Sequence, residues 1–324
     1  MSALFGALST RGAPLPPDLG AKMAQALAHR PAEVQGVHQV GPLLLGARSQ
    51  WLAEEDEGQS PPWVCPVSSA LVLFDGRLDH RERLAAELGA SAGQSDAALV
   101  AAAHARWGED FVDRLHGDFA LCLWDPREHT LTLARDVFGV RPLYWAYTAS
   151  GVLLFASQAR PLFAHPELAR ELDALRMGQY LVGLFTDAER TFFRGVERLA
   201  PGHRLRVRLG DAAPRKHRFF AFDPRREFAP RSNAEFSEQF RELLLNAVRV
   251  RTRTRAPLGC LLSGGVDSSG LLGALRALEP AREVPCFSAR FVDFPEIDEG
   301  HWLALLDGPN VVRAELRADR ISPM

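Results

Sequence analysis

The stretch Leu258-Gly-Cys-Leu-Leu-Ser-Gly-Gly-Val-Asp-Ser-Ser269 joins a short apolar run to a polar turn, and an apolar-periodic segment follows it. This order predicts a strand, a loop and a helix that together hold an anion. The glycines let successive backbone N–H groups point inward, and the helix adds the positive end of its dipole. An alternative interpretation is a Gly-Ser turn before an ordinary helix. The residues expected to bind nucleotide phosphates are Ser263, Gly264, Gly265, Ser268 and Ser269.

Asp267 indicates what kind of phosphate chemistry the loop supports. A carboxylate cannot bind an anion directly, but it can hold a divalent cation that bridges the phosphates, and we expect Mg²⁺ there. The loop also lacks the Lys of the G-x-x-x-x-G-K-[ST] pattern. A pyrophosphate held by amides, hydroxyls and a metal is a good leaving group. The sequence therefore favours transfer of AMP from ATP to a carboxylate over transfer of the γ-phosphate.

The composition sets limits on the rest of the chain. Its 324 residues are 47% hydrophobic and 24% charged, which allows two globular domains with separate cores. A net charge of −2 and the lack of a long apolar run argue against nucleic-acid and membrane partners. The N-terminus has no export-signal pattern, so we expect a cytoplasmic protein. The four cysteines are widely spaced and three lie in apolar runs, which favours buried thiols over disulfides or a zinc site.

Short segments rich in β-formers dominate residues 70–157 and predict strands separated by turns. Two helices are expected among them, one opening at Asp79 and one at Ser95. The run 119–124 is apolar at every position, which is typical of a strand buried between packed layers. The N-terminal part is therefore predicted to be a layered α+β domain. The predicted strands are Ala70–Phe74, Phe119–Trp124, Thr130–Ala134, Pro142–Tyr147 and Val152–Ala156.

Residues 209–232 carry three prolines and many basic side chains, and we predict a linker there between domains at 1–208 and 233–324. Ser232-Asn-Ala-Glu235 is a capping-box pattern that predicts the start of a helix. Four alternating arginines precede the anion loop and are either a solvated helix end or additional phosphate ligands. They are Arg249, Arg251, Arg253 and Arg255.

Alternating elements follow the anion loop and predict a parallel sheet with right-handed crossovers. We expect the helix after the loop to end at Leu278. A strand, a helix and a short strand should come next. Their predicted bounds are Val284–Phe291, Glu296–Leu306 and Val311–Val312.

Four stretches of the chain, given at the end of this paragraph, make it resemble the asparagine synthetase family. That family joins an N-terminal glutaminase-type domain, an Ntn-hydrolase-like sandwich, to a C-terminal α/β ATP-pyrophosphatase domain with a parallel sheet. The resemblance implies ATP and Mg²⁺ as cofactors, with Asp267 and Ser268 at the pyrophosphate and its metal. It also implies backbone contacts from Leu261 and Ala289 to adenine, although both residues are equally compatible with a plain core strand. The four stretches are Ser263–Ser269, Ala134–Tyr144, Gly117–Asp125 and Phe155–Arg160.

The departures from the family concern the glutaminase. Ser2 stands where the family has its N-terminal Cys nucleophile, and a hydroxyl is a much weaker nucleophile at neutral pH. Asp75 stands where the family offers an amide to the developing oxyanion, and a carboxylate repels that charge. We therefore identify no catalytic residue in this domain and expect no glutamine hydrolysis. The resemblance implies that the remnants of the glutamine pocket are Arg48, Asp75, Gly76, Arg77 and Asp96.

Some members of the family resemble the chain in this loss. The β-lactam synthetases and the cyclases that close lasso peptides adenylate a carboxylate, and an amine of the same substrate then attacks it, so proximity replaces the ammonia supply. Phe294–Glu299 and Asp75–Asp79 look similar to stretches of the lasso cyclases. These matches favour a small-molecule or peptide carboxylate as substrate and a peptide cyclase over a general ligase.

Few residues follow Ser269, and the family's later acidic metal ligand has no counterpart among them. We therefore expect the ATP-binding domain to be incomplete. The chain is then a fragment of a longer enzyme, an enzyme that needs a second polypeptide, or a decayed copy. The competing hypothesis is a non-catalytic binding or scaffold protein that keeps the fold without turnover.

Overall fold

The computed structural model describes residues 2–227 and 232–320. The chain forms two compact units, Met1–Asp223 and Pro224–Met324. The division lies inside the predicted linker, but the first part of that segment belongs to the N-terminal unit. Strand β12 (Arg215–Arg218) pairs with β11 (His203–Arg208) there. All four residues of β12 are exposed and basic, as is common on a sheet edge. The sequence analysis missed this strand because it has no apolar residues.

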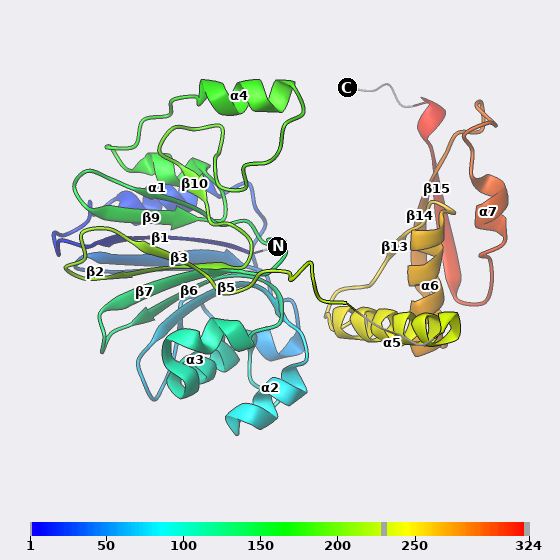
Figure 1. Ribbon diagram of the computed structural model, residues 1–324, viewed down its shortest axis with the longest axis horizontal. Helices are drawn as coiled ribbons and strands as arrows, with labels where there is room; N and C mark the ends of the chain where they lie inside the picture. Colours follow the sequence, from blue (N-terminus) through cyan, green and yellow to red (C-terminus); the bar gives the residue numbers. More distant parts are fainter. Residues whose placement is uncertain (1, 228–231, 321–324) are drawn as a thin grey trace. The chain divides into compact units, whose positions relative to one another are not determined.

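The N-terminal unit contains two six-stranded antiparallel sheets (Figure 1). The first has the order β10-β8-β9-β1-β3-β2 and the second the order β12-β11-β7-β6-β5-β4. The first sheet consists of β1 (Ala3–Ser9), β2 (Val34–Val40), β3 (Leu43–Ser49), β8 (Tyr144–Tyr147), β9 (Val152–Ala156) and β10 (Glu197–Arg198). Besides β11 and β12, the second consists of β4 (Trp63–Val64), β5 (Leu71–Leu78), β6 (Gly117–Asp125) and β7 (Thr130–Arg135).

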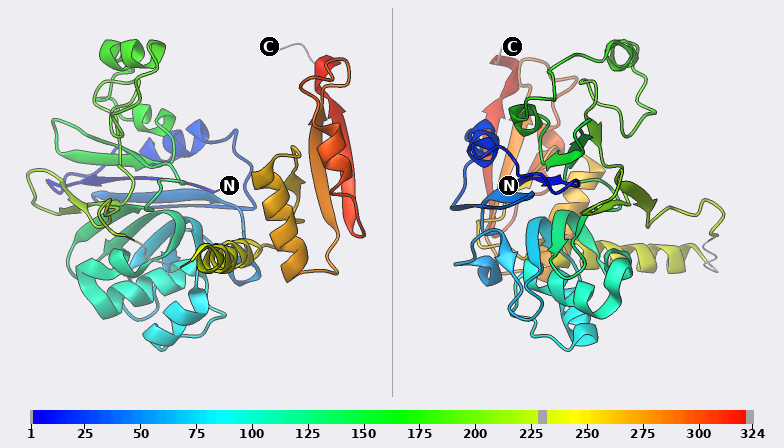
Figure 2. Two further views of the ribbon diagram at one scale, coloured as in Figure 1. Left: turned by 45° about the vertical axis from the view of Figure 1, so that its right-hand side comes forward. Right: turned by 90° about the vertical axis from the view of Figure 1, so that its left-hand side faces the viewer.

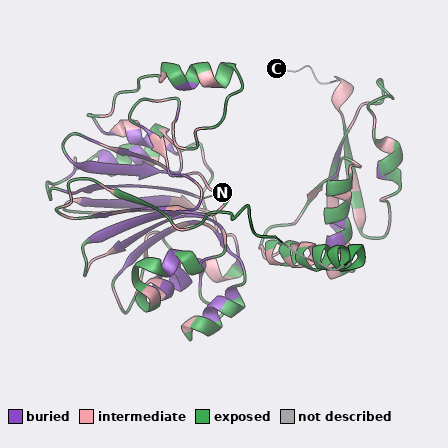
Figure 3. Cartoon of the chain, in the orientation of Figure 1, coloured by how far each residue is buried: buried purple, intermediate pink, exposed green. Residues whose placement is uncertain are grey.

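The two sheets pack face to face. Leu4 and Leu45 from the first sheet share one core with Leu73 and Leu133 from the second. The predicted strand 119–124 is buried along its whole length in β6, because one face meets this core and the other meets helices. Figure 3 shows buried residues throughout both sheets.

Helices cover the outer faces of the sandwich, which gives the N-terminal unit four layers. The predicted helix at Ser95 is confirmed, and the Ser95 side chain accepts a hydrogen bond from the backbone N–H of Ala98 at 3.3 Å. The predicted α+β, Ntn-hydrolase-like sandwich is confirmed. The helical elements are α1 (Leu19–Ala26), η1 (Glu54–Asp56), α2 (Arg81–Leu88), α3 (Asp96–Trp107), η2 (Gly108–Arg114), η3 (Arg160–Ala164) and α4 (Ala174–Leu181).

The C-terminal unit has a three-stranded parallel sheet in the order β13-β14-β15, which confirms the predicted α/β arrangement. Its helix α5 begins where the capping pattern predicts, with the Ser232 hydroxyl accepting from the backbone N–H of Glu235 at 3.3 Å. The elements are α5 (Asn233–Arg251), β13 (Cys260–Leu261), α6 (Val266–Leu278), β14 (Val284–Arg290), α7 (Gly300–Ala304), β15 (Val311–Arg317) and η4 (Ala318–Arg320).

Within residues 232–320, helices cover only one face of this sheet. Figure 2 shows α6 against one face of the three strands, and Cys286 of β14 is buried there beside Leu272 and Leu275 of α6. On the other face the side chains of Phe287 and Leu316 are 50% and 59% exposed. Alternate residues of a strand point to opposite faces, so the exposed set follows directly from the register.

Two elements of this unit differ in length from the prediction. The last strand extends to Arg317 instead of ending at Val312, because it pairs with β14 along its full length. The last helix begins only at Gly300. The segment before it is held instead by Asp298, which accepts hydrogen bonds from the Arg290 guanidinium and the backbone N–H of Phe291.

Among the helices in the described ranges, none is both long and apolar enough to cross a membrane. The four cysteines are free thiols. Cys122 and Cys286 are buried as predicted, whereas Cys65 and Cys260 are only partly buried.

Candidate functional site

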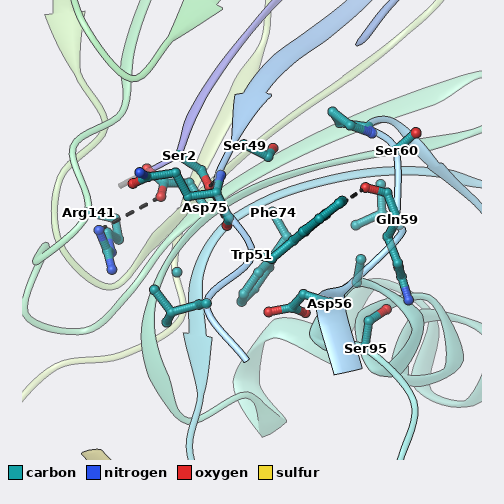
Figure 4. Close-up of a pocket in the computed structure, with 16 residues that line it drawn as sticks. Ser2, Ser49, Trp51, Asp56, Gln59, Ser60, Phe74, Asp75, Ser95 and Arg141 are labelled. Atoms are coloured by element: carbon teal, nitrogen blue, oxygen red, sulfur yellow. Dashed lines mark hydrogen bonds and ion pairs between the residues drawn. The ribbon is translucent and has the colours of Figure 1, made fainter. Parts of the chain in front are cut away.

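A cavity of about 80 Å³ lies where the two sheets of the N-terminal unit end beside Ser2 (Figure 4). Ser2 precedes β1, Ser49 ends β3, and Asp75 lies on β5. The walls also contain Trp51 and Arg141. The indole N–H of Trp51 donates to the backbone carbonyl of Gln59 at 3.1 Å, which fixes one wall. The cavity is large enough for a few water molecules or a small ligand group.

The Ser2 hydroxyl is bound by main chain. It accepts a hydrogen bond from the backbone N–H of Gln50 at 3.1 Å and donates to the Gln50 carbonyl at 3.4 Å. Within residues 2–227 and 232–320 this hydroxyl makes no hydrogen bond to a side chain that could take its proton. An alcohol needs such a base to act as a nucleophile.

Asp75 brings a carboxyl group into the same cavity. Its side chain is almost fully buried, and burial raises its pKa to about 6, although the positive charges of Arg141 and Arg30 partly offset this effect. The Arg141 guanidinium lies 3.8 Å from the carboxylate. At neutral pH the cavity therefore contains a carboxylate where the family would place a neutral amide.

Gly76 and Arg77 have structural surroundings that explain their identities. Gly76 lines the cavity with a φ of +151°, and an added Cβ would lie 2.0 Å from the backbone oxygen of Asp118 on β6. Only glycine fits this backbone position. Arg77 does not line the cavity, and its guanidinium donates to Asp79 at 3.3 Å.

Asp96 is occupied by partners inside the protein. Its carboxylate accepts from the Arg81 guanidinium at 2.6 Å and from the backbone N–H of Leu78 at 2.9 Å. Both charged side chains are buried, with 6% of Arg81 and 3% of Asp96 exposed. Arg81 also reaches Glu55 at 2.6 Å. Because Ser95 and Ala97 line the cavity while Asp96 does not, this carboxylate faces the protein interior.

Arg48 also points away from the cavity. Ser49 lines it, and neighbouring residues of a strand face opposite sides. The Arg48 guanidinium donates to the backbone carbonyl of Arg30 at 3.2 Å and to the Gln35 side chain at 2.6 Å. The structure thus brings Ser2, Asp75 and Gly76 together, but not Arg48, Arg77 or Asp96.

Arg141 is one of the wall residues that the sequence analysis did not predict. Asp136 fixes its backbone by accepting from the Arg141 N–H at 3.1 Å, and it also accepts from Phe138 and Val140. The Arg141 Nε atom is buried and has no hydrogen-bond partner in the described part of the chain. Arg141 lies inside the stretch 134–144 that resembles the family, and this position could have indicated a role in the site.

The predicted anion loop of the C-terminal unit connects β13 to α6. The hydroxyls of Ser263 and Ser268 lie 3.1 Å apart, and Ser268 and Ser269 both donate to the carbonyl of Gly265 at 3.1 and 2.8 Å. The N–H of Gly265 donates to the Ser263 hydroxyl at 3.3 Å. These bonds fix the loop through its own polar groups.

The loop presents the start of α6 to its exposed side. Gly264 has a φ of +87°, and an added Cβ would lie 3.1 Å from the Cβ of Trp302. Helix α6 begins after Gly265, which has no side chain to cap it, so the first-turn N–H groups can serve an anion. Asp267 is exposed in this first turn. The described residues contain no cluster of three or more metal-ligating side chains.

Leu261 and Ala289 lie on one face of the parallel sheet near the carboxyl ends of its strands. Leu261 of β13 pairs with Phe287 of β14, and Ala289 is two residues further along β14. Leu261 is 81% exposed, and Ala289 is also exposed. The alternative of a plain core strand therefore does not describe these two side chains in this structure.

Comparisons with known proteins identify the family of the chain. A family model described as a glutamine amidotransferase domain matches residues 1–220, and one described as asparagine synthase matches residues 239–306. The chain belongs to the asparagine synthetase family. The second match contains the whole anion loop, and the first contains the cavity beside Ser2.

Three relatives show how far the similarity extends. The amidase chyE of Penicillium rubens is 29% identical over 84% of this chain and 42% of its own length. The amidase chry2 of Gibberella zeae is 31% identical over 78% of this chain and 38% of its own length. Asparagine synthetase [glutamine-hydrolyzing] 1 of Bacillus subtilis is 27% identical over 86% of this chain and 44% of its own length. The chain thus spans less than half the length of these relatives.

Proposed function

We propose that the protein is an ATP-dependent carbon–nitrogen ligase of the asparagine synthetase type that works without glutamine hydrolysis. A substrate carboxylate oxygen attacks the α-phosphorus of ATP, and the bond to pyrophosphate breaks. An amine then attacks the acyl carbon, AMP leaves, and the amine loses a proton. The observation that carries the proposal is the contrast between an anion loop that keeps the family sequence and a Ser2 cavity that does not.

The anion loop supports nucleotide binding through several independent features. Gly264 and Gly265 leave room at the start of α6, and its N–H groups suit phosphate oxygens. Asp267 is an exposed carboxylate beside these groups, which fits Mg²⁺, and the ion would supply charge neutralisation of the leaving pyrophosphate. Leu261 and Ala289 provide an exposed apolar surface on which an adenine ring can lie.

The Ser2 cavity supports the second half of the proposal. The hydroxyl is bound to the main chain of Gln50, Asp75 adds a carboxylate, and Asp96 is paired with Arg81. Such a cavity neither generates a nucleophile nor stabilises an oxyanion. The attacking amine would then belong to the substrate, as in a peptide macrocyclase. A second polypeptide that completes the ATP-binding domain is compatible with the same chemistry.

Product analysis with α-labelled ATP tests this function. The protein is incubated with Mg²⁺-ATP and with aspartate or linear peptides that carry an acidic side chain. We expect substrate-dependent AMP and pyrophosphate. Asp267→Asn should lower turnover on the order of a hundredfold, about 2.7 kcal/mol, because metal-mediated charge stabilisation is lost. Asp307→Asn, outside the loop, is the matched control.

Two outcomes would contradict the proposal. Release of ADP and phosphate would mean that the loop supports γ-phosphate transfer instead. Nucleotide binding without turnover of any carboxylate would favour the alternative of a binding or scaffold protein.

A further inference from the structure

A second cavity of the N-terminal unit, of about 350 Å³, is lined by four arginines and by no acidic residue. They come from distant parts of the sequence: Arg30 follows α1, Arg176 lies on α4, Arg190 precedes β10, and Arg198 ends it. This size falls in the range of small-molecule sites. A concentration of like charge in one cavity is unfavourable unless an anion compensates for it.

Arg176 carries the strongest evidence. Arg176 is only 6% exposed. Its Nη1 atom is buried and has no hydrogen-bond partner in the described ranges. The guanidinium lies 5.9 Å from the centre of the Phe192 ring, which also lines the cavity. Arginine cannot release its proton in a protein, so this buried group remains charged.

The other arginines differ in how they are compensated. Arg190 is paired with Asp173 at 2.8 Å and with Asp187 at 3.5 Å, so its charge is largely satisfied. Arg198 donates only to backbone carbonyls, those of Asp187 and Arg190, and its buried Nε has no partner among the described residues. Among residues 2–227 and 232–320, no ion pair within 4 Å joins a carboxylate to the guanidinium of Arg30, Arg176 or Arg198, and the carboxylates of Asp75 and Asp187 act on Arg30 and Arg176 only from a longer distance.

The other residues that line the cavity indicate what kind of group accompanies the anion in the ligand. Tyr144, Phe192 and Phe193 contribute aromatic surface, and Ser157 and Gln158 add polar groups. Guanidinium groups bind carboxylates and phosphates through paired N–H donors. A ligand that has both an oxyanion and an apolar body would therefore satisfy both kinds of wall.

We propose that this cavity binds a small organic anion, with its carboxylate or phosphate group at Arg176 and Arg198 and its apolar part against the aromatic walls. The site shares no lining residue with the Ser2 cavity and contains no residue of the anion loop. It does not depend on the proposed ligase activity, because every residue involved belongs to the N-terminal unit.

Isothermal titration calorimetry tests the site with phenyl phosphate and phenylacetate as probes. Inorganic phosphate and benzyl alcohol separate the contribution of the charge from that of the ring. We expect saturable binding of at least one aromatic anion, weaker binding of phosphate and none of benzyl alcohol. Comparison of the two aromatic anions shows whether a phosphate or a carboxylate is preferred.

Matched variants make the test specific. Arg176→Gln should weaken binding at least tenfold, while Arg194→Gln, at a 65% exposed arginine of the same region, should not change it. Arg30→Gln removes a cavity charge whose guanidinium makes no hydrogen bond within the described residues, so the fold should tolerate it. It should weaken binding several-fold, which keeps the test valid even if Arg176→Gln does not fold. The proposal is wrong if millimolar probe does not bind the wild-type protein, or if both cavity variants bind as well as wild type.

Discussion

The Ser2 cavity and the anion loop belong to the same family pattern, but their polar groups are used in opposite ways. At the cavity the Ser2 hydroxyl is bound by main chain, and behind the cavity wall the Arg81 guanidinium pairs with the carboxylates of Asp96 and Glu55. In the loop the internal bonds fix the backbone, and the start of α6 and Asp267 stay accessible. Polar groups without partners inside the protein remain available to a ligand. The contrast therefore supports the proposal that the loop binds the nucleotide.

The largest change in stability is expected at the buried ion pair between Arg81 and Asp96, which holds the Asp96 carboxylate away from the cavity. Arg81→Met leaves a buried carboxylate without its cation and should lower the free energy of unfolding by about 3–5 kcal/mol. Arg83→Met is the matched control, because its side chain is 83% exposed and pairs with Glu87 one turn along the same helix. That pair should be worth roughly 0.5 kcal/mol or less.

Urea denaturation of both variants measures the difference. Arg81→Met combined with Asp96→Leu should recover part of the loss, since the Asp96 carboxylate is then no longer buried without its cation. Equal stabilities for Arg81→Met and wild type would mean that the pair does not hold Asp96 away from the cavity.

A smaller change in stability, which depends on pH, is expected when Asp75 is substituted. Burial raises its pKa to about 6, from an ordinary value of 3.8. Between these values the folded protein keeps a proton that the unfolded chain has released, so this carboxyl lowers stability as pH rises through that window. Asp75→Asn removes the effect and should stabilise the protein by about 1–3 kcal/mol at pH 7, and by much less at pH 4.

Thermal unfolding of wild type and Asp75→Asn across this pH range checks the prediction. Glu167→Gln serves as a control of opposite sign, because hydrogen bonds from Ser150 lower the pKa of Glu167. A stability difference for Asp75→Asn that stays constant with pH would show that Asp75 is not destabilised by burial.

The smallest effect is expected in the loop. Gly264→Ala places a Cβ on a backbone with a φ of +87° and close to Trp302, which should cost about 1–2 kcal/mol. Gly273→Ala, inside α6 with open space around it, should instead stabilise the protein by about 0.5–1 kcal/mol. Nucleotide binding should weaken only in Gly264→Ala. Equal weakening in both variants would contradict the proposal that the loop binds the nucleotide.

Local sequence signals predicted those parts of the fold that depend on local chemistry. Ser95 and Ser232 begin helices because their hydroxyls cap the next turn, and 119–124 is buried because every residue there is apolar. The basic strand β12 was missed, since an exposed edge strand has no apolar alternation. The N-terminal strands β1 to β3 also lay outside the predicted set.

The site residues show a similar division. The anion loop is continuous in sequence, so its glycines and Asp267 could be predicted from one stretch. The partner of Asp96 could not, because Arg81 approaches it from another helix through packing. Arg48 could have been placed on the opposite face from Ser49 by strand alternation alone. The arginine cavity depends on residues 30 to 198 meeting in space, and no local pattern reveals it.

Ammonia release from glutamine, measured in a coupled assay with Mg²⁺-ATP present, tests the central claim most directly. We predict no signal above a Ser2→Ala control for the wild-type protein. We expect none for Ser2→Cys either, because Asp75 still places a carboxylate in the cavity. Ammonia release by the wild-type protein that Ser2→Ala abolishes would contradict the account, since the cavity would then be a working glutaminase.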